Sequence, residues 1–409
     1  MHFLHHTPDL SATGGSRNIL DLSEYLCAQG HEVSIIIDAN RIAFNVDPRI
    51  KLYLLKKGKL SPLSNQSQES AIDNYKSKKK KKAKKRTAFK RAVRKIQNIK
   101  RYFIKLLVFP VNCSIIRGFV AKNNIDFIAS HNMYTFFEHF FYYPKDKFAL
   151  MLRNSPNEVF LERGVVRLLP FKHYFNQRLC LGVSQATIDE IKALQFGVLD
   201  RSFAIYNPFD FNTIRENAKA TPNCDYDIYN KRYILSLSSL DKRKRIDRIL
   251  YALAQSSDKD IELVLVGTGP TQVELTELAE SLGLSHRVHF LGFQDNPYPF
   301  IKQADMLILA SDSEGLPTVL IESLICGTPV ISTDCPCGPN EILVDDLKEY
   351  LIPITNIKEE VIHHGIATCI DKLVQNRLPI EERHVARFSK ESVVQNWINV
   401  ASRDNERTQ

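Results

Sequence analysis

The stretch Ser311–Thr333 reads SDSEGLPTVLIESLICGTPVIST and decides the fold class. An apolar run, Met306–Ala310, precedes it, and a Gly-Leu-Pro turn leads into a helical pattern around Pro317–Cys326. Gly327 is placed to end this helix, and a second apolar run, Val330–Thr333, follows it. A strand, a helix and a strand in this order are typical of a parallel sheet covered by helices.

The same alternation of short apolar runs and longer amphipathic stretches continues along the chain. In the first half the expected strands are Met1–His5, Val33–Asp38, Ile50–Leu55, Ile125–Ser130, Phe148–Arg153, Leu179–Ser184 and Phe203–Tyr206. In the second half they are Tyr233–Leu237, Ile261–Val266, Val288–Leu291, Met306–Ala310 and Val330–Thr333. Between the two series, Asn207–Arg232 is rich in Pro, Asn and Asp and is expected to link two domains.

The chain has 409 residues, more than the roughly 250 to 300 residues at which a single core stops growing. We therefore predict an α/β fold with two Rossmann-like domains, residues 1–208 and 209–388, facing each other across a cleft. A C-terminal helix around Ser389–Val400, within residues 389–409, is expected to cross back to the first domain. Hydrophobic residues make up 44% of the chain, which excludes a wholly disordered protein.

The charge is unevenly distributed. The chain carries 55 Lys and Arg and 46 Asp and Glu, a formal charge of +9, yet residues 76–105 alone hold sixteen bases and no acid. The remaining 39 bases and 46 acids give the rest of the chain a charge of −7. The protein is thus a mildly acidic body with one strongly basic segment, which lies in an insertion of about residues 61–105.

Three interpretations of the basic segment compete. Nucleic acid binding fits the charge, but few aromatics are interleaved and no nucleic-acid module is present. A solvated loop is the second interpretation. Binding to an anionic membrane fits best, because an amphipathic pattern follows the lysines and each base near such a surface contributes on the order of 1 kcal/mol. The expected membrane-binding residues are Lys78, Lys79, Lys80, Lys81, Lys82, Lys84, Lys85 and Arg86.

Other classes of protein are disfavoured by the sequence. The N-terminus has no basic region followed by an apolar run, so we expect no signal peptide. No apolar stretch approaches the ~20 residues that a spanning helix needs. Cys335 and Cys337 form a close pair among eight cysteines, but no matching Cys or His pair accompanies them, so we expect no metal site.

The segment quoted first also carries the chemistry. Glu314 precedes the expected helix and Glu322 lies inside it. Backbone N–H groups at the helix start can meet an anion, whereas carboxylates accept hydrogen bonds from hydroxyls. A nucleotide sugar offers both partners, and the expected donor contacts at this turn are Gly315, Leu316, Pro317 and Thr318. From spacing alone, the alternative is that Glu314 and Glu322 are ordinary surface glutamates beside the start of a helix.

Several motifs in the same order resemble retaining GT-B glycosyltransferases of family 4. They are EGLPTVLIE followed by SLICGTPVIST, TGGSRNILDLSEYLCAQGHEVSIII near the N-terminus, GVSQATIDEI with IYNPFD, SSLDKRKRID, LVLVGTGP, VHFLGF and STDCPCGPNEIL. The resemblance covers most of the chain outside the basic insertion. The last motif is similar to a loop of enzymes that build bacterial surface polysaccharides.

The resemblance implies roles for individual residues. Glu314 would contact donor-sugar hydroxyls, Glu322 the ribose, and Lys244 the donor diphosphate. Ser239 stands where the family usually has an arginine, so Arg243 or Arg245 is expected to supply that charge. The alternative is that the basic run Lys242–Arg245 is simply the solvent-exposed start of a helix.

Further candidates lie in loops that follow expected strands. Gly267 and Gly269 are expected to form a turn near the nucleotide; Gln272 stands where a dinucleotide fingerprint would have its third glycine. Gly14 and Gly15 would allow close approach of the backbone to the donor, and Phe293 belongs to a second nucleotide loop. His131 is a candidate catalytic residue, because a histidine near this position is catalytic in part of the family; the alternative is a purely structural histidine. Arg153 is a candidate for contact with the donor or the acceptor; the alternative is an ion pair at the end of a strand.

The resemblance implies a GT-B hexosyltransferase that needs no cofactor besides its nucleoside-diphosphate sugar, with a UDP-sugar favoured over a GDP-sugar. The expected acceptor is a lipid-linked, lipopolysaccharide or capsule glycan at the inner face of the cell membrane. A GT-B nucleotide-sugar epimerase is the alternative within enzymes. A non-catalytic protein that binds anionic membranes or nucleic acid is the alternative of another class, but it leaves the glutamate pair without a role.

Overall fold

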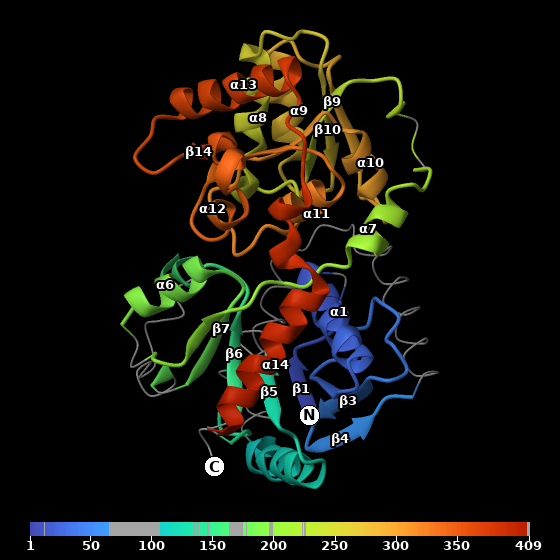
Figure 1. Cartoon of the computed structure of the whole chain (residues 1–409), viewed down its shortest axis with the longest axis vertical. Helices are drawn as coiled ribbons and strands as arrows, with labels where there is room; N and C mark the ends of the chain where they lie inside the picture. Colours follow the sequence, from blue (N-terminus) through green and yellow to red (C-terminus); the bar gives the residue numbers. More distant parts are fainter. Residues whose placement is uncertain are drawn as a thin grey trace, which may run out of the picture.

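The computed structural model describes residues 1–406 except residues 12, 65–106, 132, 134–135, 137–138, 145–146, 163–174, 177, 196–198, 223 and 225. Two sheets, one above the other in Figure 1, form the centres of two domains. The predicted membrane-binding residues, Lys78 to Arg86, lie outside the described residues.

The first sheet has the order β4-β3-β2-β1-β5-β6-β7-β8, and only β4 runs antiparallel to its neighbour among the described strands. Its strands are β1 (His2–Thr7), β2 (Glu32–Ile37), β3 (Lys51–Lys56), β4 (Lys59–Pro62), β5 (Phe127–Ser130), β6 (Phe148–Leu152), β7 (Leu179–Gly182) and β8 (Ser202–Ala204). Strands β1, β5, β6 and β7 are buried along their length, because helices and loops cover both faces of a parallel sheet.

The second sheet is parallel, in the order β11-β10-β9-β12-β13-β14. Its strands are β9 (Tyr233–Leu237), β10 (Glu262–Val266), β11 (Val288–Gly292), β12 (Met306–Leu309), β13 (Val330–Asp334) and β14 (Leu351–Pro353). Both orders place β1 and β9, the first strand of each sheet, in the interior, and the chain then builds outward on each side. This arrangement leaves a switch point at the carboxyl ends of the strands, where ligands of open α/β sheets bind.

Helices connect the strands and cover the sheets. They are α1 (Gly14–Ala28), α6 (Gln185–Ala193), α7 (Phe211–Asn217), α8 (Ile246–Gln255), α9 (Gln272–Ser281), α10 (Tyr298–Gln303), α11 (Thr318–Ile325), α12 (Pro339–Ile342), α13 (Glu359–Gln375), α14 (Lys390–Glu406) and a helix over residues 107–122. None of the described helices combines the length and apolar character that crossing a membrane requires.

Local sequence explains where the helices that frame the cleft begin. Thr13 caps α1 by accepting a hydrogen bond from the backbone N–H of Ser16, and Ser184 and Thr187 form a capping box at the start of α6. The C-terminal helix α14 starts beside the second domain and runs down across the first (Figure 1). Its Trp397 is buried there against Phe127 of β5, with ring centroids 6.0 Å apart.

The structure confirms every predicted strand to within a few residues and adds two that were not predicted, β4 and β14. β4 reaches Pro62, so the basic insertion expected from residue 61 begins after this edge strand. The predicted linker Asn207–Arg232 contains the short helix α7. Pro317, expected within the first helical turn, precedes α11 as its N-cap residue instead.

Candidate active site

A cavity of about 510 Å³ lies between the two domains at the carboxyl ends of the strands. From the first domain it is lined by the loop after β1, the start of α1 and the residues after β5 and β6. From the second it is lined by Glu314, Gly315, Leu316 and Thr318. The structure therefore brings Gly14, Gly15, His131 and Arg153 to the same cavity as the glutamate motif.

The Lys244 ammonium lies 2.6 Å from Oε1 of Glu314, and only 14% and 11% of the two side chains are exposed. Lys244 ends a short 3-10 helix after β9, whereas Glu314 follows β12, so neighbouring parallel strands bring the two charges together. Arg243 adds a second positive charge, 3.5 Å from Oε2 of the same carboxylate, and donates to the carbonyl oxygen of Ser313. This cluster holds two cations beside the start of α11.

Arg245, the other candidate for the missing family arginine, points elsewhere. Its left-handed backbone, with φ of 47°, turns the chain between Lys244 and α8. Its guanidinium pairs with Asp247, Asp312 and Glu359 at 2.8, 3.3 and 3.0 Å. None of Arg243, Lys244 and Arg245 lines the cleft cavity, but Arg243 and Lys244 contact Glu314, which does. The Ser239 hydroxyl donates to Asp241 across 2.6 Å. Geometry therefore favours Arg243 over Arg245 as the cation next to Lys244.

The turn before α11 is tightly packed against the first domain. A Cβ atom at Gly315 would clash with the carbonyl oxygen of Arg153, so only glycine lets the two domains approach this closely. The hydroxyl of Ser184 donates to the carbonyl oxygen of Gly315 across 3.0 Å. Pro317 lies just before the helix, where it donates no backbone hydrogen bond, and Thr318 opens α11 at the cavity wall.

Across the cavity, Gly14 and Gly15 open helix α1. A Cβ atom at Gly14 would meet no atom within 4 Å, and one at Gly15 would only touch Arg153 and Thr13. Their backbone N–H groups are among those that a helix leaves without intrahelical partners. The start of α1 and the start of α11 thus line the same cavity from opposite domains.

A second cavity, of about 470 Å³, continues from the first and shares Gly14, Asn18 and Thr318 with it. Glu322 lines this second cavity together with Asp21 and Tyr298. Burial raises the pKa of the Glu322 carboxyl to about 7; a hydrogen bond with Tyr298 opposes the rise, and the nearby Asp21 adds to it. The two glutamates of the motif therefore line two connected compartments.

Gly267, Gly269 and Phe293 do not line either cavity. Gly267 has φ of 140°, and a Cβ atom there would clash with the carbonyl oxygen of Ser238; at Gly269 it would clash with that of Leu240. These glycines allow the loops after β9 and β10 to cross closely. Phe293, after β11, is 59% exposed.

His131 and Arg153 line the cleft from the first domain. His131 is buried, and its Nδ1 lies 2.9 Å from Nη2 of Arg153. Burial lowers the pKa of His131 well below its ordinary value, and the charge of Arg153 and then His5 lower it further. The imidazole is therefore neutral at physiological pH.

Comparison with known proteins identifies the second half of the chain. Residues 226–387 match the family model of glycosyl transferases group 1. The second domain is a glycosyl transferases group 1 domain. An uncharacterised glycosyltransferase of Methanocaldococcus jannaschii is 27% identical over 208 residues, which are 49% of this chain and 51% of that protein. The N-acetylgalactosamine-N,N'-diacetylbacillosaminyl-diphospho-undecaprenol 4-alpha-N-acetylgalactosaminyltransferase of Campylobacter jejuni is 34% identical over 168 residues, 41% of this chain and 44% of that protein.

The chain spans about half the length of these curated relatives. The fold extends further: the crystal structure of HepE from Anabaena in complex with UDP covers 98% of this chain and 100% of its own, with a TM-score of 0.64 at 18% identity. HepE has also been solved with UDP-glucose, with a TM-score of 0.62 at 17% identity, over 98% of this chain and 99% of its own. The likeness confirms the predicted GT-B fold.

One contact between the group 1 domain and the first domain was not predicted. Glu341, in the STDCPCGPNEIL motif, accepts hydrogen bonds from the backbone N–H groups of Gln185 and Ala186, both at 2.8 Å, and from the hydroxyl of Tyr206 at 3.2 Å. These N–H groups open helix α6, where a carboxylate is electrostatically favoured. Glu341 therefore bridges the two domains.

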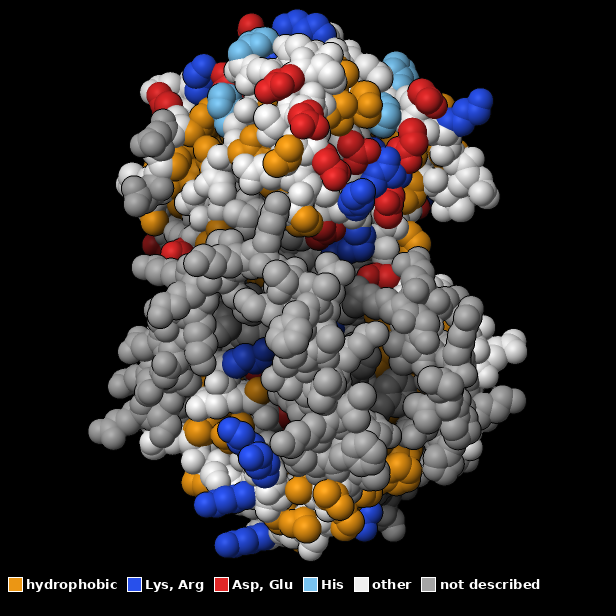
Figure 2. Space-filling view, turned by 180° about the vertical axis from the view of Figure 1, so that it is seen from behind, with side chains coloured by type: hydrophobic (Ala, Val, Ile, Leu, Met, Phe, Trp, Pro, Cys, Tyr) orange, Lys and Arg blue, Asp and Glu red, His pale blue; other side chains and the backbone are white. Residues whose placement is uncertain are grey.

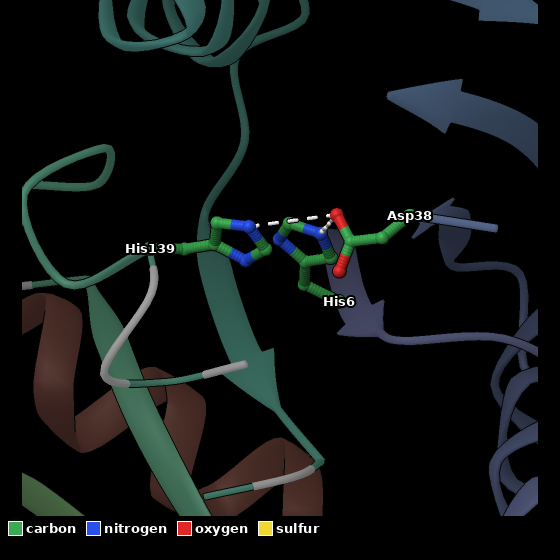
Figure 3. Close-up of side chains that lie close together, drawn as sticks. All are labelled: His6, Asp38 and His139. Atoms are coloured by element: carbon green, nitrogen blue, oxygen red, sulfur yellow. Dashed lines mark hydrogen bonds and ion pairs between the residues drawn. The ribbon is translucent and has the colours of Figure 1, made fainter. Parts of the chain in front are cut away.

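A second unpredicted cluster, His6, Asp38 and His139, lies near the carboxyl ends of β1 and β2 (Figure 3). The Nε2 atoms of His6 and His139 lie 3.3 and 3.4 Å from one carboxylate oxygen of Asp38, and the Tyr143 hydroxyl lies 2.7 Å from Nδ1 of His6. The two imidazole rings are stacked, with centroids 4.2 Å apart and planes inclined by 4°. Ligand atoms of His6, Asp38 and His139 all lie within 4.8 Å of one another.

Proposed function

We propose that this chain is a glycosyltransferase that moves a hexose-type sugar from a nucleoside-diphosphate sugar to a glycan acceptor. The observation that carries this proposal is the Lys244–Glu314 pair near the start of helix α11: Glu314 lines the cavity opposite the start of helix α1, and Lys244 contacts Glu314 from outside the cavity lining. The group 1 match of the second domain and the names of its relatives support it.

The chemical step needs positive charge at the leaving diphosphate. Lys244 and Arg243 supply this charge beside Glu314, and unpaired N–H groups at the start of α11 add partial charge of the same sign. Glu314 then orients hydroxyls of the transferred sugar by accepting their hydrogen bonds. In this proposal these groups neutralise the leaving group, and no cofactor besides the donor takes part. Retention at the anomeric carbon follows from the family resemblance.

The nucleoside of the donor belongs in the second cavity. Glu322 lines that cavity, and its carboxylate suits the two hydroxyls of a ribose. The complexes of HepE with UDP and UDP-glucose support a UDP-sugar over a GDP-sugar. A donor lying across both cavities places the ribose near Glu322 and the sugar near Glu314.

The acceptor in our proposal is a lipid-linked or lipopolysaccharide-type glycan at the inner face of the cell membrane. The diphospho-undecaprenol named for the Campylobacter jejuni relative supports a lipid-linked acceptor. Hydrophobic and basic side chains lie side by side at the end of the first domain that faces away from the second (Figure 2). Leu107 and Val111, at the start of the helix over residues 107–122, are 77% and 49% exposed and follow the basic segment directly. This combination suits an anionic membrane better than nucleic acid.

Incubation of the full chain with a panel of UDP- and GDP-sugars and a bacterial lipid extract tests the proposal. We expect release of the nucleoside diphosphate together with a lipid-linked product heavier by one sugar, detected by mass spectrometry. Lys244→Ala and Glu314→Ala should each lower turnover by about 10²- to 10³-fold, the usual loss when a group that stabilises the transition state is removed.

Lys372→Ala and Glu349→Ala serve as matched controls, since they remove a lysine–glutamate pair on the exposed surface of the second domain. Full activity of Lys244→Ala and Glu314→Ala would contradict the site. Conversion of the donor sugar to its epimer without any transfer product would contradict the proposed reaction and indicate an epimerase.

A further inference from the structure

Three side chains in the wall of the cleft form one row of hydrogen bonds. Nη2 of Arg153 lies 2.9 Å from Nδ1 of His131, and Nε2 of His131 lies 2.7 Å from Nδ1 of His5. Nη1 of Arg153 also donates to the side-chain oxygen of Asn207 across 2.9 Å. His5 comes from β1 and His131 and Arg153 follow β5 and β6, so the row crosses three neighbouring strands of the first sheet.

The chemistry of the guanidinium fixes where each proton lies in this row. Arginine has only donors, so Nδ1 of His131 must accept and carries no proton. A neutral imidazole then has its proton on Nε2, which donates to Nδ1 of His5. Nδ1 of His5 is therefore also an acceptor, and the His5 proton lies on Nε2.

The last nitrogen of the row, Nε2 of His5, is the one that the assignment leaves protonated. Nε2 of His5 is buried and has no hydrogen-bond partner among the described residues. Leaving one N–H unpaired costs about 1 to 3 kcal/mol. The other neutral tautomer of His5 would point an N–H group at the N–H group of His131, which loses the hydrogen bond and adds repulsion. The Nε2–H of His5 is therefore left unpaired when the hydrogen bonds from Arg153 to His131 and from His131 to His5 are both made.

Trp397 of helix α14 packs against both imidazoles. The Trp397 ring packs edge-on against His5 at a centroid distance of 6.0 Å and lies 6.2 Å from the ring of His131 with planes inclined by 30°. Burial, and then the charge of Arg153, lower the pKa of His5 to about 3. Both rings are neutral at physiological pH.

We propose that His5 is a positioning residue: it fixes His131 as the tautomer with an unprotonated Nδ1, and this nitrogen holds the Arg153 guanidinium in the wall of the cleft. In this arrangement His131 serves Arg153 as an acceptor and is not the acid or base of the reaction. The Nε atom of Arg153 is itself buried and has no hydrogen-bond partner within the described part of the chain. The assignment of protons is independent of any activity, whereas its effect on turnover rests on the proposed glycosyltransferase function.

Long-range proton–nitrogen NMR of the full chain labelled with ¹⁵N-histidine tests the assignment directly, because protonated and unprotonated ring nitrogens resonate far apart. Loss of signals in His5→Asn and His131→Asn identifies the two residues. We expect His131 with a protonated Nε2 and a bare Nδ1, and no titration of its ring between about pH 5.5 and 8.5. A proton on Nδ1, or a titration in this range, overturns the proposal.

Paired variants test the effect on the reaction. The side-chain oxygen of asparagine can take the place of Nδ1 of histidine, whereas leucine removes the acceptor and keeps the bulk. We therefore expect His5→Asn to retain more of the parent kcat/KM than His5→Leu, and His131→Asn to retain more than His131→Leu, with each leucine variant losing about tenfold, the value of one hydrogen bond.

An acid or base at position 131 gives the opposite pattern, with His131→Asn as impaired as His131→Leu, and this result overturns the proposal. Absence of any sugar transfer by the parent chain refutes the proposed function, while the NMR experiment still decides on the tautomer.

Discussion

Lys244 and Glu314 form a mostly buried ion pair, 2.6 Å apart, at the point where the second domain meets the cleft. In the proposed reaction both side chains have other partners: Lys244 the diphosphate and Glu314 the hydroxyls of the sugar. The pair is therefore a resting arrangement that a bound donor rearranges, with Arg243 ready to share the negative charge.

The first prediction concerns the stability of this pair. Lys244→Ala should lower the free energy of unfolding by about 1 to 3 kcal/mol, because it leaves a mostly buried carboxylate without its nearest cation. Lys244→Ala/Glu314→Ala should recover part of this loss, so a double-mutant cycle from urea unfolding should give a coupling energy of at least about 1 kcal/mol. The exposed Lys372–Glu349 pair should give less than about 1 kcal/mol. Equal coupling in the two cycles would contradict this prediction.

The second prediction separates binding from turnover at Glu314. Without a sugar attached, UDP brings negative charge close to this carboxylate and competes with it for Lys244. Glu314→Gln should therefore bind UDP more tightly, by about tenfold or 1.4 kcal/mol, although it transfers sugar more slowly. Calorimetric titration with UDP measures this affinity, and weaker binding by the variant would show that Glu314 contributes to nucleotide binding.

The third prediction is a pH dependence due to Glu322. Its pKa is about 7 in the folded chain and 4.5 ordinarily, so the folded state holds a proton that the unfolded state releases between these values. The Glu322 contribution to the free energy of unfolding is highest below about pH 4.5, falls as the pH rises towards 7 and stays low above. At 1.36 kcal/mol per pKa unit the fall is at most about 3 kcal/mol.

Glu322→Gln removes this titration. The variant should match the parent near pH 4.5 and exceed its stability above pH 7 by up to about 3 kcal/mol, as measured by urea unfolding across pH. Glu360→Gln, at an exposed position of α13, is the control. A stability difference that does not change between pH 5 and pH 8 would refute the assigned pKa shift.

The fourth prediction concerns the bridge between the domains. Glu341→Ala leaves the N–H groups of Gln185 and Ala186 without their carboxylate partner. Hydrogen exchange of these two amides should become about tenfold faster, the effect of roughly 1.4 kcal/mol. Asp189→Ala, which removes only the exposed contact to the Gln185 side chain, should leave the exchange nearly unchanged. Unchanged protection in Glu341→Ala would mean that the bridge does not hold α6.

The fifth prediction tests the membrane face of the first domain. Leu107→Glu and Val111→Glu place negative charge on exposed apolar positions and should together weaken sedimentation with phosphatidylglycerol vesicles by about tenfold or more. Val361→Glu changes an exposed valine on the second domain and should have no effect. Deletion of residues 76–86 should remove the salt dependence of binding, and salt-insensitive binding by the parent chain would contradict the electrostatic part.

Much of the fold could be predicted because its signals are local. Each buried parallel strand, such as Tyr233–Leu237, appears in the sequence as a continuous apolar run, and turn residues mark its ends. The edge strands β4 and β14 escaped prediction, since they have only three or four residues and are partly exposed, and β4 carries no apolar run. The order of motifs likewise placed Glu314, Glu322 and Lys244 in one domain.

The contacts between these motifs follow from tertiary structure alone. His5 and His131 are 126 residues apart in sequence, and Glu341 and Ala186 are 155 apart, so no spacing rule connects them. The choice between Arg243 and Arg245 also depended on the left-handed turn at Arg245, which directs its side chain towards Asp247 and Glu359.

The sequence by itself determined the two α/β domains, the basic segment and the residue types of the site, because hydrophobic period, charge and short motifs are properties of neighbouring residues. Only the tertiary structure decided that His131 is tied to His5 and Arg153 and that Glu322 lies half-buried beside Tyr298 and Asp21. Protonation depends on burial and on charges brought close by folding, and the linear order of residues carries neither.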